Sequence, residues 1–160
     1  MARIREYRPE DASQVERCFI VLQEHERTVE PRRATGEAVC EKYLEYMHRR
    51  AVETGGRVFV AEADGQIVGF SCVWAHVPED ELINAPGEFA YVSDLVVLPP
   101  FRGRRLGYEL LRACEEYAVA EGARSLKIGV LARNWGARQL YERFGFEEST
   151  VEMTKNLEAK

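Results

Sequence analysis

The sequence has little of what a metal site or a disulfide framework requires. Its four cysteines and three histidines lie far apart in the chain, and no two cysteines form a C-x-x-C pair. Cysteines spaced in this way are typical of small buried side chains in a reduced, cytoplasmic protein. Scattered histidines also lack the spacing of zinc ligands. We therefore expect no bound metal and a cytoplasmic location.

Long apolar runs and an excess of positive charge are also missing. No stretch approaches the ~18 apolar residues of a membrane span, and residues 1–6 lack the apolar region of a signal peptide. The chain has 22 Lys and Arg against 27 Asp and Glu, which gives a net charge of −5. Domains that bind nucleic acids are usually basic. These absences argue against both a membrane partner and a nucleic-acid partner.

What remains is the composition of an ordinary globular chain. Apolar residues make up 46% of the sequence, and neither a repeat nor a low-complexity segment interrupts it. A length of 160 residues is enough to bury one hydrophobic core. We predict a single domain over residues 1–160.

Periodicity and turn residues predict an α+β (mixed α/β) order of elements. Asp64-Gly65, between two apolar runs, is a strong hairpin signal. Thr35 and Asn134 are suited to cap helices, and residues 76–87 form a loop. The expected elements are a strand at 3–8, helices at 9–27 and 35–54, strands at 57–63, 66–74 and 88–98, a helix at 106–120, a strand at 125–131, a helix at 134–144 and a final strand or hairpin at 146–157.

The most informative stretch runs from Ser93 to Gly107. Residues 95–98 form a continuous apolar run, as expected of a strand buried on both faces, and two prolines end it. Residues 102–107 then open a helix. A Gly/Arg turn at a helix N-terminus offers an anion free N–H groups, a dipole and cations. We expect a phosphorylated cofactor there; the alternative is an arginine-rich surface turn that only caps the helix.

Two motifs resemble those of the GCN5-related N-acetyltransferase (GNAT) superfamily. The cofactor turn of that superfamily reads Arg/Gln-x-x-Gly-x-Gly/Ala, and residues 102–107 read Arg-Gly-Arg-Arg-Leu-Gly. Its second signature matches Asn134, Ala137, Leu140-Tyr141 and the Phe-Gly-Phe at 144–146. One departure is Arg105, which replaces the middle glycine of the turn. Its amide can still donate to a phosphate if the backbone stays helical rather than left-handed.

The resemblance implies a GNAT-like acyl-CoA N-acyltransferase fold. The expected sheet is central and mostly antiparallel, has six to seven strands, splays between the fourth and fifth strands, and carries about four helices on its faces. The implied co-substrate is acetyl-CoA, and the implied reaction is direct attack by a primary amine of a small molecule or peptide. A homodimer is left open, because members of the superfamily are often homodimers.

The same resemblance assigns the cofactor-binding residues. The pyrophosphate would take the amides of the turn, and the pantetheine arm would enter the splay. A bulge near Leu95-Val96 would aim one N–H at the thioester carbonyl. Asn134 would bond the arm or simply cap its helix. The expected residues are Leu95, Val96, Val97, Arg102, Gly103, Arg104, Arg105, Leu106, Gly107, Tyr108, Asn134, Ala137 and Tyr141.

Two residues are candidates for the proton transfers. By resemblance, Tyr141 is the acid beside the leaving sulfur, and the alternative is packing within its helix. Asp94 would share a face with Val92 and accept the proton of the amine through water. Its alternative role is a structural hydrogen bond to backbone amides. Glu88, at the mouth of the same strand, is a weaker candidate for the base.

The acceptor pocket is expected between the end of the first helix, the second helix and the loop at 76–87. Glu24 and Glu26 would attract a cationic amine there, although a solvated helix end is the alternative. Two other classes of function compete with the enzyme. One is a non-catalytic acyl-CoA-binding or sensing module on the same fold. The other is contact with RNA or DNA through Arg102, Arg104 and Arg105, which the acidic balance disfavours.

Overall fold

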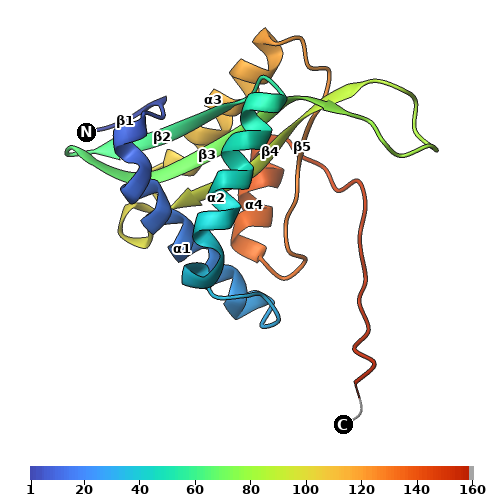
Figure 1. Ribbon diagram of the computed structural model, residues 1–160, viewed down its shortest axis with the longest axis horizontal. Coiled ribbons are helices and arrows are strands. Elements are labelled where there is room, and N and C mark those ends of the chain that lie inside the picture. Colours follow the sequence, from blue (N-terminus) through green and yellow to red (C-terminus); the bar gives the residue numbers. More distant parts are fainter. Residues whose placement is uncertain (159–160) are drawn as a thin grey trace.

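The computed structural model describes residues 1–158 and contains a five-stranded sheet between two layers of helices (Figure 1). The strand order follows the chain, and neighbouring strands are antiparallel except for β4 and β5, which are parallel. The elements are β1 (Ala2–Glu6), the 3-10 helix η1 (Pro9–Asp11), α1 (Ala12–Val29), α2 (Gly36–Glu53), β2 (Arg57–Ala63), β3 (Gln66–Pro78), β4 (Glu88–Val97), the 3-10 helix η2 (Pro99–Phe101), α3 (Leu106–Ala120), β5 (Leu126–Ile128) and α4 (Trp135–Phe144).

Local signals set the ends of several elements. The hydroxyl of Thr35 accepts a hydrogen bond from the Ala38 N–H at 3.3 Å, so α2 begins at the predicted cap. Asp64 and Gly65 have φ values of 50° and 76°, as the two-residue hairpin requires. Gly122 has a φ of 86° and lies just beyond the end of α3. These elements match the prediction because short-range chemistry decides their ends.

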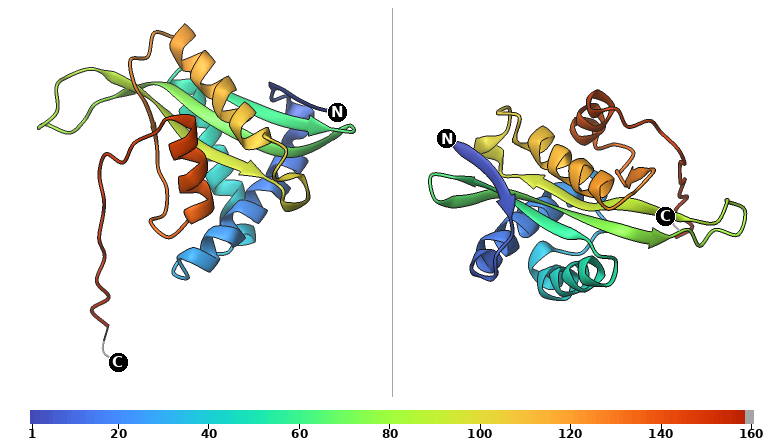
Figure 2. Two further views of the ribbon diagram at one scale, coloured as in Figure 1. Left: turned by 180° about the vertical axis from the view of Figure 1, so that it is seen from behind. Right: turned by 90° about the horizontal axis from the view of Figure 1, so that it is seen from above.

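The helices divide between the two faces of the sheet. Figure 2 shows α1 and α2 on one face and α3 and α4 on the other. Each pair covers its own buried cluster: Phe19, Met47 and Phe70 lie in the first, and Leu110 and Leu111 lie in the second. The α+β class and the four helices on the faces are therefore confirmed. None of the helices within residues 1–158 has both the length and the apolar character needed to cross a membrane.

The sheet has five strands in the described residues, whereas we predicted six to seven. The final strand expected at 146–157 is not formed. Val151, Met153 and Leu157 are 69%, 91% and 85% exposed, so within the described residues these apolar side chains stay largely outside the core. A β-strand requires hydrogen bonds to a neighbouring strand, and an alternating apolar pattern alone does not provide them. β5 is also shorter than predicted, with three residues, and offers only a short edge.

Candidate active site

A β-bulge at Ser93 decides which way Asp94 points. Asp94 lies opposite Cys72, but Val92 lies opposite Val73, so Ser93 is the unpaired extra residue of β4. Directly opposed residues share a face of the sheet, and Cys72 and Val73 belong to opposite core clusters. Asp94 therefore faces α1 and α2, whereas Val92 faces α3 and α4. The prediction that these two residues share a face is wrong, because the bulge interrupts the alternation.

Beyond this bulge, β4 and β5 part. The two strands pair only through residues 90–92 and 126–128, so the rest of the β4 edge has no partner strand in the described chain. The Leu98 N–H donates to Val68 O on β3 at 2.8 Å. By alternation, the backbone groups of Leu95 and Val97 point into the gap. The predicted splay between the fourth and fifth strands is confirmed. The bulge lies at Ser93 rather than near Leu95-Val96.

The gap opens into a cleft of about 1380 Å³. Typical small-molecule pockets measure roughly 300–1,000 Å³, so this cleft has room for a long ligand together with a second molecule. Its walls come from α1, α2, β4, the start of α3 and the segment from β5 through α4. Its charged lining residues are the acids Glu26 and Asp94 and the arginines Arg33, Arg102, Arg105, Arg133 and Arg143. The cleft is therefore locally basic in a chain of net charge −5.

The turn before α3 presents free backbone amides. The first helical hydrogen bond runs from the Glu109 N–H to Arg105 O, so the N–H groups of residues 106–108 have no acceptor within the helix. Gly103 and Arg105 are left-handed, with φ values of 76° and 64°. The condition set for Arg105, a helical rather than left-handed backbone, is therefore not met. Such turns form concave sets of amides that bind anions, so the turn fits a pyrophosphate.

The arginines of this turn differ in what they contact. Arg102 donates from Nε to Val97 O at 2.9 Å and braces the end of β4. The Arg105 guanidinium lies 5.4 Å from the ring centre of Tyr108, and that of Arg104 lies 5.3 Å from that of Phe101. Arg104 does not line the cleft. The other residues predicted to bind the cofactor all line it: Leu95, Val96, Val97, Arg102, Gly103, Arg105, Leu106, Gly107, Tyr108, Asn134, Ala137 and Tyr141.

The left-handed backbone at Gly103 and Arg105 lets us predict how substitutions there change the free energy of unfolding. Replacing Arg105 by glycine should raise the free energy of unfolding by about 0.5–1 kcal/mol, because the strain of a side chain at positive φ is removed. Gly103→Ala should lower it by about 1 kcal/mol, although a Cβ there has no neighbour within 4 Å. Urea denaturation measures both changes.

Gly136→Ala is the matched control for Gly103→Ala. Gly136 also has open space around a Cβ, but it lies inside α4 and does not have a positive φ. This substitution should stabilise the protein slightly through helix propensity. If Gly103→Ala and Gly136→Ala shift stability in the same direction, backbone strain does not explain the behaviour of the turn.

Asp94 is a buried carboxylate with two hydroxyl donors. Tyr43 donates to its oxygens at 3.0 Å, and the Ser93 hydroxyl donates at 2.7 Å. Burial raises the pKa of Asp94 to about 6, against the effect of these two donors. The charge of Glu26 contributes to this raised value. A carboxyl group that titrates near neutral pH can exchange protons at the pH of the cell.

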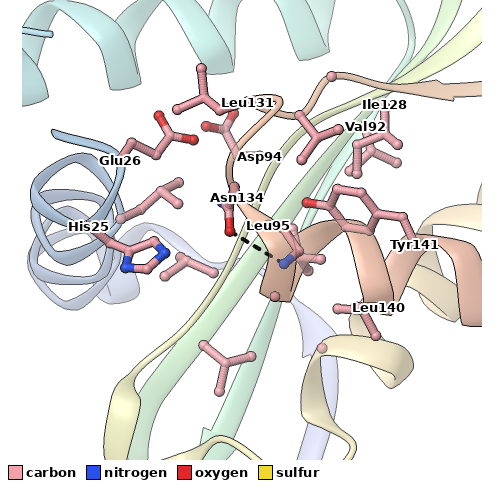
Figure 3. Close-up of a pocket in the computed structure, with 18 of the residues that line it drawn as sticks. His25, Glu26, Val92, Asp94, Leu95, Ile128, Leu131, Asn134, Leu140 and Tyr141 are labelled. Carbon is pink, nitrogen blue, oxygen red and sulfur yellow. Dashed lines mark hydrogen bonds between the residues drawn. The ribbon is translucent and has the colours of Figure 1, made fainter. Parts of the chain in front are cut away.

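Glu26 approaches Asp94 from α1, and Figure 3 shows the two carboxylates facing each other. Burial raises the pKa of Glu26 above its ordinary value. Arg33 opposes that shift and pairs with Glu26 at 3.0 Å. The cleft thus brings together one predicted base and one predicted acceptor-binding residue.

Tyr141 closes the opposite side of the cleft. Its hydroxyl points into the cavity (Figure 3), and its ring packs edge-on against Phe146 with centres 6.0 Å apart. Burial raises the pKa of Tyr141 above its ordinary value, and the charges of Glu26 and Asp94 add to this shift. The phenol therefore keeps its proton and is available as an acid. It also belongs to the core, so the packing role and the acid role are compatible.

Asn134 serves as a helix cap. Its side-chain oxygen accepts a hydrogen bond from the Ala137 N–H at 3.3 Å, drawn as the dashed line in Figure 3. It also lines the cleft. Capping and contact with a ligand are again compatible.

Two predicted residues do not reach the cleft. Glu24 accepts from the Gly36 N–H at 2.8 Å and from Arg27 at 2.7 Å, so it joins α1 to the start of α2. Glu88 contacts His76 at 2.9 Å. It lies six residues before Asp94 on an extended strand, roughly 20 Å away. The structure therefore provides no support for Glu88 as the base.

The loop between β3 and β4, which we expected to help form the acceptor pocket, lies elsewhere. β3 continues through Pro78, so the hairpin projects beyond the sheet and its tip lies away from α1 (Figure 1). Leu82 and Ile83 at the tip are 101% and 91% exposed. None of the residues 76–87 lines the cleft, whereas α1 and α2 both do.

Sequence reasoning missed the role of Tyr43. It placed this residue only on the apolar stripe of the second helix, yet its hydroxyl bonds a residue 51 positions later in the chain. A tyrosine within an apolar stripe is a weak signal of a buried polar partner. Arg33 was missed as well, because nothing in the linker sequence indicates its contact with Glu26.

A mixed sheet that splays beside a helix N-terminus agrees with the N-acyltransferase fold expected from the two motifs. The model of the acetyltransferase (GNAT) family matches residues 17–146. The chain therefore belongs to the acetyltransferase (GNAT) family, as its two motifs predicted.

Curated relatives and solved structures agree with this assignment. The chain is 38% identical over 96 residues to an uncharacterized N-acetyltransferase of Methanocaldococcus jannaschii, covering 58% of this chain and 40% of the relative. It is 35% identical over 91 residues to one of Bacillus subtilis, covering 57% and 54%. The matches thus span about half the length of these relatives or less. A mutant of the BH1408 protein from Bacillus halodurans shares the fold, with a TM-score of 0.81, 21% identity and coverage of 97% and 99%.

Proposed function

We propose that this protein transfers the acetyl group of acetyl-CoA to a primary amine by direct attack. One observation carries the proposal: a single cleft holds the unpaired edge of β4, the amides at the start of α3, Asp94 and Tyr141. The first two features suit a long phosphorylated thioester. The last two suit the proton transfers of amine acylation.

The binding role follows from charge and from unpaired backbone. The amides of the turn at 103–108 would take the pyrophosphate, and the arginines of the lining would add opposite charge. The pantetheine arm contains amides that need partners in a buried gap. Leu95 has its N–H and C=O directed there, so it would pair with the arm and place one donor near the thioester carbonyl.

The chemical role requires one base and one acid. Bound acetyl-CoA would supply an acetyl group on a good leaving thiolate. Asp94 would accept the proton of the incoming ammonium, directly or through water, which frees the amine lone pair. Tyr141 would donate its phenolic proton to the departing sulfur, and the second proton, released by the acylated nitrogen, would restore the phenol through water. Glu26 would attract the cationic form of the acceptor to the same end of the cleft.

Calorimetric titration with acetyl-CoA tests this proposal. We expect one site per chain and an affinity that falls as salt rises, because exposed ion pairs with phosphate are screened. Release of free thiol would then be followed across polyamines, aminoglycosides, amino acids and peptide N-termini. Binding with no turnover on any of these amines would favour a non-catalytic acyl-CoA-binding module. A folded protein that does not bind acetyl-CoA would refute both functions.

A further inference from the structure

Tyr43 and Asp94 make the closest polar contact between α2 and the floor of the cleft. The Tyr43 oxygen lies 3.0 Å from each carboxylate oxygen of Asp94. Burial and the charge of Asp94 raise the pKa of Tyr43 above its ordinary value, so the phenol keeps its proton and is the donor. Since Ser93 donates to Oδ2 at 2.7 Å, each carboxylate oxygen has one donor within reach.

Packing fixes where this donor stands. The Tyr43 ring is stacked on Phe19 of α1, with centres 4.8 Å apart and an angle of 12° between the planes. Tyr46 lies one turn further along α2, and its ring centre is 6.2 Å from the ring centre of Tyr43. A phenol held between two helices has few ways to turn away from its partner. The hydrogen bond to Asp94 is therefore built into the α1–α2 layer.

We propose that Tyr43 is a positioning residue that keeps Asp94 ionised and oriented toward the acceptor side of the cleft. This inference rests on the proposed function, in which Asp94 is the base. Nothing in the family assignment requires a hydroxyl from α2 at this point. The geometry supports it because the donor, the bulge at Ser93 and the carboxylate meet at the place where β4 and β5 separate.

The groups around Asp94 decide its charge together. They are Glu26 of α1, Tyr43 of α2, Cys72 of β3, Tyr91 and Ser93 of β4, and Tyr141 of α4, with Arg33 against Glu26. The two bonded hydroxyls favour the carboxylate, whereas burial and the charge of Glu26 disfavour it. Removing one donor should therefore move Asp94 toward its neutral form.

An NMR titration measures this directly. The chain holds four aspartates, Asp11, Asp64, Asp80 and Asp94, so protein labelled with ¹³C at the aspartate carboxyl carbon gives few signals. The Asp94→Asn protein identifies the signal of Asp94. We expect the pKa of Asp94 to lie near 6 in the wild type and about one pH unit higher in Tyr43→Phe, a roughly tenfold change in proton affinity.

Tyr46→Phe is the matched control, because it removes a hydroxyl from the same helix and the same aromatic group. The pKa of Asp94 should not move in this protein. An unchanged pKa in Tyr43→Phe, or equal shifts in both proteins, would overturn the proposal. If Tyr43→Phe does not fold, 3-fluorotyrosine at position 43 replaces it. Its more acidic hydroxyl is a stronger donor and should lower the pKa of Asp94, and no change there would also overturn the proposal.

The same proteins separate this inference from the proposed function. Calorimetry with acetyl-CoA should give equal affinities for wild type, Tyr43→Phe and Tyr46→Phe. With an active amine in hand, the acid limb of the kcat/KM profile should move up with the pKa of Asp94 in Tyr43→Phe. A pKa shift without any binding of acetyl-CoA would refute the proposed function and leave the link between Tyr43 and Asp94 intact. A shifted pKa with an unshifted profile would refute the positioning role.

Discussion

Replacing Asp94 by asparagine should lower kcat/KM by about 10²–10⁴-fold, the usual contribution of a positioned base. The amide has nearly the shape of the carboxylate but cannot accept the proton of the amine. The affinity for acetyl-CoA should stay within about twofold, since Asp94 lies apart from the turn before α3. The measurement is free-thiol release with an active amine, combined with calorimetry.

The same substitution should also stabilise the protein at pH 8. The pKa of Asp94 is raised from 3.8 to about 6, so this group favours the folded state fully below pH 4. That contribution is lost as the pH rises through about 6. At pH 8 the buried charge of Asp94 therefore lowers the free energy of unfolding by about 3 kcal/mol. Asparagine removes this charge but pairs less well with the two hydroxyl donors, so we expect the free energy of unfolding at pH 8 to rise by about 1–3 kcal/mol. The gain should be present at pH 8 and disappear near pH 4.

Asp80→Asn is the control for both effects. Asp80 is exposed in the loop after β3 and does not line the cleft, so its substitution should change neither turnover nor stability at pH 8. An Asp94→Asn protein with normal turnover would exclude Asp94 as the base. Equal stability of that protein and the wild type at pH 8 would show that the buried charge costs little.

Replacing Tyr141 by phenylalanine should lower kcat by about 10²-fold, toward the lower end of general acid catalysis. The ring keeps its contact with Phe146, so the fold should remain. Since the pKa of Tyr141 is raised above its ordinary value, the hydroxyl stays protonated at working pH and its loss removes a proton donor. Turnover and acetyl-CoA affinity should therefore separate, with affinity close to that of the wild type.

Tyr117→Phe gives the comparison for a structural tyrosine. The Tyr117 hydroxyl donates to Gly55 O at 2.7 Å, at a site outside the cleft. Its loss should lower stability by about 1 kcal/mol and leave kcat unchanged. If both tyrosine variants lower stability alone and neither affects turnover, Tyr141 is a core residue and the acid must be sought elsewhere.

The sequence predicts the fold well wherever local chemistry decides it. Thr35, Asp64-Gly65 and Gly122 set ends of elements through contacts that span a few residues. The turn at 102–107 is also local, because a strand, two prolines and a Gly/Arg run are contiguous. These contiguous features predict an anion site at the start of α3, and the residues of this turn apart from Arg104 line the cleft.

The surroundings of Asp94 depend on contacts between distant segments, which the sequence does not reveal. A single extra residue at Ser93 reverses the face on which Asp94 lies, and no local pattern marks it. The partner of Asp94 is a tyrosine on α2, chosen by the packing of two helices. The sequence leaves the conformation of Arg105 open for a related reason: the surrounding turn, rather than the residue type, holds it at a φ of 64°.

The short pairing of β4 with β5 sets where a ligand along the edge of β4 would begin and end. Only three residues of each strand are paired, and beyond them the two segments of the chain separate. Asp94 lies two residues beyond the last paired residue, Val92, whereas the turn at the start of α3 lies at the far end. A molecule lying along the free edge of β4 would therefore have one end beside Asp94, near the paired residues, and the other end at the turn before α3.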